Sequence, residues 1–79
     1  MPREKTMKVV FAFPTITMAM KMEAAAKAKE APGRLIPVPR QISAGCGMAW
    51  CAPVADRVSL EQLIATEQIV TEGCYELLL

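Results

Sequence analysis

One short apolar run constrains the fold of this chain more than any other segment. Residues 8–13 read Lys-Val-Val-Phe-Ala-Phe, and Pro14 closes the run. A short run of β-branched and aromatic residues that does not alternate with polar ones is typical of a strand buried on both faces. We therefore predict a central strand over residues 8–13.

The segment that follows predicts a first helix, from Ile16 to about Ala31. It is rich in Ala, Met, Lys and Glu, which favour helices, and a Pro-Gly pair ends it. Thr15 is the predicted N-cap. Helical spacing assigns the inner face to Ala19, Met22 and Ala26.

A second helix is predicted over residues 54–67, with its inner face formed by Leu60, Leu63 and Ile64. Residues 59–62 read Ser-Leu-Glu-Gln, which would act as a capping box if the helix started late.

Three further strands complete the pattern. Residues 34–39 contain two prolines, which cannot donate to a central ladder, so this segment is predicted as an edge strand. Residues 47–52 and 68–79 are predicted as the third and fourth strands, with a bulge or bend at Gly73. The resulting fold class is α+β, a ferredoxin-like βαββαβ sandwich in which two helices cover one face of a four-stranded antiparallel sheet.

Seventy-nine residues are enough for one domain, which we place at residues 8–79, after a polar segment 1–7 predicted to be a disordered leader. Hydrophobic residues make up 53% of the chain, so a second copy could cover part of its apolar surface. A homodimer is therefore one possible state.

The distribution of charged residues and the length of the apolar stretches predict which kinds of partner the protein lacks. Nine Lys and Arg residues balance eight Asp and Glu residues without forming a dense basic cluster, so we expect no nucleic-acid partner. No stretch approaches the roughly 18 apolar residues of a membrane span, so we expect no membrane insertion.

The numbers of cysteine and histidine residues limit the kinds of catalytic and metal site that the chain can form. The chain has three cysteines and no histidine. An odd number of cysteines favours a reducing cytoplasm over a secreted disulfide framework. Without histidine, Cys-His pairs, Ser-His-Asp triads and most zinc sites are excluded, and we expect no metal or cofactor.

The best candidate for a working residue is Cys46. In the predicted topology it shares one end of the domain with the start of the first helix, near Thr15. A helix N-terminus carries partial positive charge, which lowers the pKa of a nearby thiol. Free cysteines are also often small buried hydrophobes, and the adjacent glycines could simply form a turn.

The residues around Cys46 could stabilise an anion bound to it. Flanking glycines allow close backbone approach and can form a small anion nest, and an arginine adds positive charge. The candidate adduct-binding residues are Ser43, Gly45, Gly47, Arg40 and Thr15.

The other sulfur-containing residues are predicted to be structural. Cys51 lies about 16 Å from Cys46 along an extended strand, beyond disulfide reach, and Cys74 is predicted in the core. Three methionines at positions 18, 20 and 22 suggest a soft-metal site. However, helical residues two apart point in nearly opposite directions, so core packing is favoured. Trp50 is also predicted in the core or an interface.

Three segments together resemble a known family. They are residues 10–15 (Val-Phe-Ala-Phe-Pro-Thr), 34–40 (Arg-Leu-Ile-Pro-Val-Pro-Arg) and 43–49 (Ser-Ala-Gly-Cys-Gly-Met-Ala). In this order and spacing they resemble small bacterial proteins of unknown function labelled selenium/sulfur carrier-like. The resemblance covers most of residues 8–77. It implies a functional cysteine at Cys46 and a role in handling reduced sulfur or selenium.

Three functions follow as hypotheses. In the first, Cys46 carries a persulfide or selenide adduct from a desulfurase-like donor enzyme to an acceptor protein, and the chain is a carrier rather than a turnover enzyme. In the second, the chain is a non-catalytic, dimerising interaction or regulatory module with a structural Cys46. A thiol oxidoreductase that uses Cys46 and Cys51 is disfavoured, because redox pairs are usually in Cys-x-x-Cys spacing.

Overall fold

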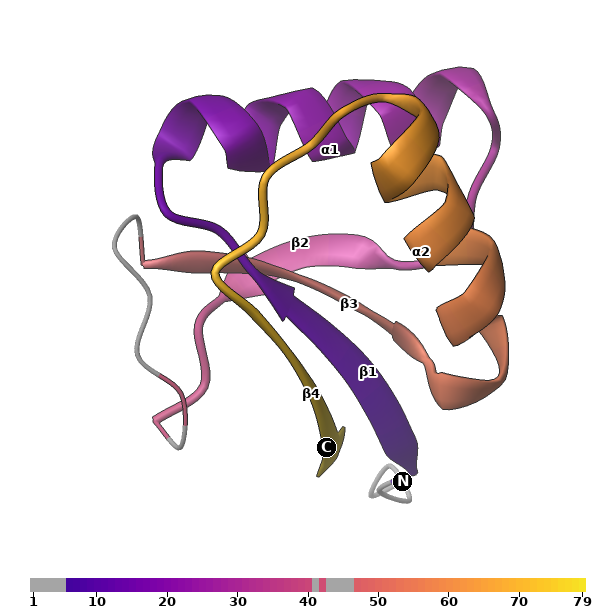
Figure 1. Ribbon diagram of the computed structural model, residues 1–79. Coiled ribbons are helices and arrows are strands. Elements are labelled where there is room, and N and C mark those ends of the chain that lie inside the picture. Colours follow the sequence, from indigo (N-terminus) through magenta and orange to yellow (C-terminus); the bar gives the residue numbers. More distant parts are fainter. Residues whose placement is uncertain (1–5, 41, 43–46) are drawn as a thin grey trace.

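A computed structural model of the protein describes residues 6–40, 42 and 47–79 (Figure 1). The strands and helices follow one another in the predicted order βαββαβ, and a short 3₁₀ turn, η1, precedes the second helix. The elements are β1 (Met7–Ala12), α1 (Ile16–Ala28), β2 (Arg34–Pro37), β3 (Met48–Pro53), η1 (Val54–Asp56), α2 (Arg57–Thr66) and β4 (Gly73–Leu78).

The four strands form one antiparallel sheet in the order β2-β3-β1-β4. β1 is central, pairing with β3 on one side and β4 on the other, and β2 is at an edge. These positions and the α+β class confirm the predictions. The ladder also extends into the segment predicted as a leader, because Met7 begins β1 and Thr6 pairs with Leu79.

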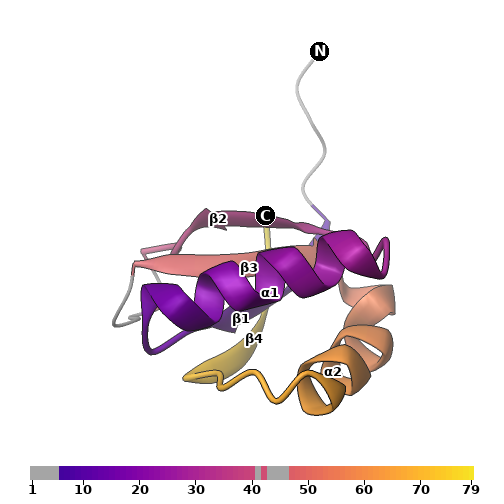
Figure 2. The same ribbon diagram turned by 90° about the horizontal axis from the view of Figure 1, so that it is seen from above.

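Both helices pack on the same side of the sheet (Figure 2). The larger apolar core lies between these two layers. It is built from alternate β1 side chains, one face of α1, and Leu60 of α2. Its fully buried members are Val9, Phe13, Ala19, Met22 and Leu60. The predicted inner faces of both helices are therefore confirmed.

The opposite side of the sheet carries a second, smaller apolar cluster. Val10, Ala12 and Ala49 are fully buried there, and Ile42, which is 7% exposed, packs with them. Because side chains alternate along a strand, successive β1 residues enter the two clusters in turn. This alternation confirms that β1 is buried on both faces.

The start of α1 confirms the predicted cap, because the Met18 N–H donates to the Thr15 hydroxyl oxygen. The helix ends three residues earlier than predicted. Glu30 adopts a left-handed conformation, and the Glu30 and Ala31 N–H groups donate to the Lys27 and Ala26 carbonyls. This hydrogen-bond pair is a Schellman motif, which satisfies the last carbonyls and turns the chain toward β2.

α2 begins at Arg57, so the conditional capping box at residues 59–62 is wrong: those residues are already helical. The helix ends in a second Schellman motif, with Gln68 left-handed and Ile69 donating to Ile64. Residues 67–72 therefore form the connection that leads from α2 back to the sheet. β4 starts at Gly73 rather than at the predicted residue 68 for this reason.

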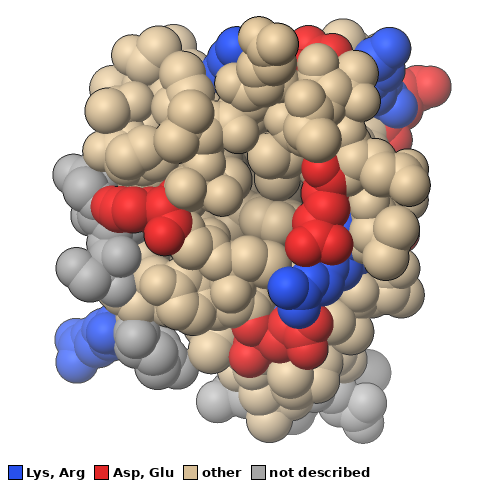
Figure 3. Space-filling view, in the orientation of Figure 1, with Lys and Arg blue, Asp and Glu red and all other residues tan. Residues whose placement is uncertain are grey.

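An ion-pair group joins the start of α2 to β4. The Arg57 guanidinium pairs with Glu76 of β4 and, at 3.4 Å, with Glu61 one helical turn later. On the face in Figure 3, acidic and basic side chains lie next to one another. Both partners of each pair are well exposed, so solvent screens their attraction and each pair adds little to stability.

The turn from α1 to β2 depends on a buried tryptophan and a glycine. The Trp50 indole N–H donates to the Pro32 carbonyl at 3.1 Å, which confirms its place in the core. Next to it, Gly33 has φ +107°. A Cβ there would lie 2.5 Å from Trp50 Nε1 and 2.6 Å from the Cys51 carbonyl oxygen.

We predict that Gly33→Ala lowers the free energy of unfolding by more than about 3 kcal/mol, because it adds a steric clash to backbone strain. Gly47→Ala is the matched control. Gly47 also has positive φ (+75°), but no described atom lies within 4 Å of its added Cβ, so we expect a cost of about 1 kcal/mol. Urea denaturation measures both values. Equal costs would contradict this packing of Gly33.

Candidate functional site

The predicted site is only partly within the structure. Ser43, Gly45 and Cys46 lie outside the described residues, whereas Thr15, Arg40 and Gly47 lie within them. The contacts of Cys46 therefore stay a prediction. The described residues show only how the segment that carries it leaves and rejoins the sheet.

The start of β3, which Gly47 directly precedes, and the start of α1 lie at the same end of the domain (Figure 1). Ala12, the last residue of β1, pairs with Ala49 near the start of β3, and α1 begins four residues after Ala12. The Val38 N–H donates to the Gly47 carbonyl at 2.9 Å. This hydrogen bond joins the two ends of the segment that carries Cys46.

The N-terminus of α1 supplies positive potential at this end. Its first turn contains no acidic residue, so no carboxylate in that turn offsets the positive end of the dipole. The Thr15 hydroxyl already accepts the Met18 N–H. Thr15 therefore has a structural role as a cap, and its predicted contact with an adduct is untested.

Arg40 lies in a turn that a hydrogen bond from the Ile42 N–H to the Pro39 carbonyl closes at 2.9 Å. Its side chain is exposed, so it can meet an anion that approaches from solvent. Its predicted proximity to Cys46 is likewise untested.

The two described cysteines are free thiols on opposite faces of the sheet. Cys51 of β3 packs against the smaller cluster, and Cys74 of β4 packs against the larger core. Burial raises the pKa of the Cys51 thiol, against the opposing effect of Lys8 and Arg34. Burial also raises the pKa of Cys74, while Arg57 opposes it. Both thiols are therefore mostly protonated and weakly nucleophilic at neutral pH.

The three methionines of α1 do not form a metal site. Met22 is fully buried, Met20 is 61% exposed, and the Met18 sulfur accepts the Val70 N–H at 3.4 Å. The prediction of core packing is thus confirmed for Met22 and wrong for Met20. Across residues 6–40, 42 and 47–79, no three His, Cys, Asp or Glu side chains converge on a possible ion.

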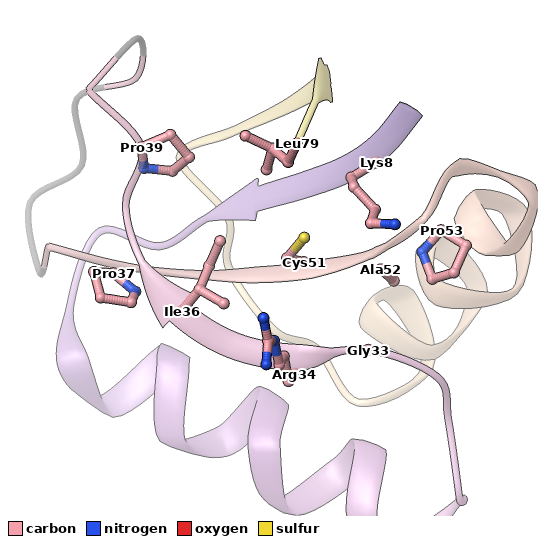
Figure 4. Close-up of a pocket in the computed structure, with 10 residues that line it drawn as sticks. All are labelled: Lys8, Gly33, Arg34, Ile36, Pro37, Pro39, Cys51, Ala52, Pro53 and Leu79. Carbon is pink, nitrogen blue, oxygen red and sulfur yellow. The ribbon is translucent and has the colours of Figure 1, made fainter. Parts of the chain in front are cut away.

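Sequence reasoning missed a hollow on the sheet face opposite the helices (Figure 4). It has a volume of about 860 Å³, and Cys51 lies in it between Lys8 and Arg34. Strand periodicity could have placed Lys8 and Val10 on one face. The predicted ferredoxin-like topology places the third strand beside the first, but it does not give their register, so the pairing of Val10 with Cys51 was not predictable.

Among the helices that the structure describes, none is both long and apolar enough to cross a membrane.

Comparison with known proteins gives one match. The family model described as "Putative Se/S carrier protein-like" matches residues 8–76. No curated protein and no solved structure matches the chain significantly.

We predict that, in a Cys46→Ser variant at pH 7, Cys51 and Cys74 react with N-ethylmaleimide at least about tenfold more slowly than an unfolded cysteine. Because both pKa values are raised, the two rates should keep increasing above about pH 9.5, where the rate of a free thiol with a pKa of about 8.5 levels off. Peptide mapping measures each rate, with urea-unfolded protein as control. Equal folded and unfolded rates at pH 7 would contradict the assigned burial.

Proposed function

Because this chain belongs to the Se/S carrier protein-like family, we propose that it carries a sulfur or selenium atom as an adduct on Cys46. The observation that supports this choice of cysteine most strongly is the state of the other two. Cys51 and Cys74 have raised pKa values and lie in sheet strands, against the two apolar clusters. Cys46 is then the thiol left to react at neutral pH.

The surroundings of Cys46 support an anionic adduct. The N-terminus of α1, whose first turn holds no acidic residue, favours a thiolate and, later, a persulfide anion at this end of the domain. Gly47, with φ +75°, adopts a conformation that side-chain-bearing residues rarely reach. In the proposed site, Ser43 and Gly45 donate hydrogen bonds to the adduct, and Arg40 adds positive charge.

The proposed reaction needs no oxidant. The Cys46 thiolate attacks the outer sulfur of a persulfide on a donor enzyme of the desulfurase type. The donor S–S bond breaks, its cysteine leaves as a thiolate, and Cys46 holds the sulfur as Cys–S–S⁻. A nucleophile of the acceptor protein then takes the outer sulfur in the same way and regenerates the Cys46 thiolate. Selenium would transfer by the same steps as Cys–S–Se⁻.

Two further parts of the proposal concern fold and compartment. We assign the domain to the ferredoxin-like class, supported by its βαββαβ order and its strand order β2-β3-β1-β4. We place the carrier in the reducing cytoplasm, where free thiols persist.

Exposed apolar side chains support a second candidate function, a non-catalytic module that dimerises or bridges partners. Large apolar residues with at least half of their surface exposed are Ile16, Met20, Val58, Val70 and Leu78. In this alternative Cys46 is structural, and the protein forms a stable dimer whether or not Cys46 is present.

Intact-mass spectrometry after incubation with a cysteine desulfurase and cysteine tests the carrier. We expect one added sulfur atom per chain, removed by dithiothreitol and absent in Cys46→Ser, because only this thiol is reactive. Cys51→Ser and Cys74→Ser are matched controls and should load like the wild type.

Loading that persists in Cys46→Ser, or no loading of any variant, would overturn the carrier. Sedimentation distinguishes the alternative: a Cys46-independent dimer that never loads with sulfur supports the interaction module.

A further inference from the structure

The hollow opposite the helices has a defined floor. Cys51 pairs in register with Val10 of β1 on one side and with Arg34 of β2 on the other. Lys8 pairs with Pro53, one step further along the same face. Strand pairing therefore fixes where both cations stand relative to the Cys51 thiol.

Apolar side chains form most of the remaining wall. Ile36, Pro37 and Pro39 line one side, and Pro53 and Leu79 close other parts (Figure 4). Prolines and strand residues lose little freedom when a ligand binds, so the wall is preformed. A hollow of about 860 Å³ with a mostly apolar lining and few polar groups has the size and character of a small-molecule site.

The charged side chains that line the hollow are all positive. The charged side chains among its lining residues are Lys8 and Arg34, and none of these residues is Asp or Glu. Arg57, by contrast, pairs with Glu61 and Glu76 near the start of α2. Lys8 and Arg34 also both act electrostatically on Cys51, so their positive potential reaches the floor.

We propose that this hollow binds a small molecule that joins an apolar body to one anionic group, either a carboxylate or an oxyanion of sulfur. The anionic group lies between Lys8 and Arg34. The apolar body lies over Cys51 against Ile36 and the proline wall.

A second copy of the chain fits this face less well. A two-fold contact would place the Lys8 and Arg34 of one copy in the same interface as those of the other, with no Asp or Glu side chain among the lining residues to pair with them. The concave shape also favours a small occupant over a flat protein surface. The inference does not depend on Cys46.

A matched pair of fluorescent probes tests the proposal. Anilinonaphthalene sulfonate has an apolar body with one sulfonate, and phenylnaphthylamine has the same body without it. We expect the sulfonate to bind the full chain more tightly than the neutral probe. Arg34→Gln and Lys8→Gln should each weaken sulfonate binding by about fivefold and leave the neutral probe unchanged.

Lys21→Gln is the charge-matched control, because Lys21 is exposed on α1 and does not line the hollow. It should bind both probes like the wild type, and circular dichroism checks that every variant is folded. Equal binding of the two probes, or equal losses in Lys21→Gln and Arg34→Gln, would overturn the proposal. So would self-association that Lys8→Gln and Arg34→Gln alter, since the occupant would then be a second copy.

Cysteine protection locates the bound probe independently. Saturating anilinonaphthalene sulfonate should slow N-ethylmaleimide labelling of Cys51 by at least about threefold, because its body covers the floor. Cys74 lies on the other face of the sheet and is an internal control whose rate should not change. Equal protection of both cysteines, or none of Cys51, would contradict binding in the hollow.

Discussion

The burial of β1 on both faces is the constraint on which the rest of the structure depends. Val9 and Phe11 enter the core under the helices, while Val10 and Ala12 enter the smaller cluster opposite. A strand buried in this way needs a neighbour on each edge, and β3 and β4 supply them. The ends of these strands then fix the two surfaces of interest, the end that bears Gly47 and the hollow around Cys51.

The two described cysteines share the same balance between burial and charge. At Cys51 two nearby cations oppose the effect of burial on the pKa, yet burial is stronger and the thiol form is favoured. At Cys74 the same competition has the same outcome. A carrier thiol needs the reverse balance, which a helix N-terminus without acidic residues can provide. The proposed division of roles follows: Cys46 reacts, while Cys51 lies beneath a binding site.

Features set by strong local signals could be predicted from sequence. The apolar run ended by Pro14 predicted β1, Thr15 predicted the cap of α1, and the prolines of β2 predicted an edge strand. The end of α1 and the start of β4 were misplaced because Glu30 and Gln68 adopt left-handed conformations without being glycine, so composition carried no signal. The hollow depends on the register between neighbouring strands, which the predicted topology does not specify. Cys46 was chosen from its motif, and its contacts lie outside the described residues.

The central claim is that Cys46 is a thiolate at neutral pH, and its thiol pKa tests this most directly. The ultraviolet absorbance of the thiolate, followed as a function of pH in a Cys51→Ser/Cys74→Ser double variant, reports this single group. The account predicts a pKa of about 7 or lower, well under the value of about 8.5 for a free cysteine. A pKa at or above that value would contradict it and would leave Cys46 as an ordinary turn residue.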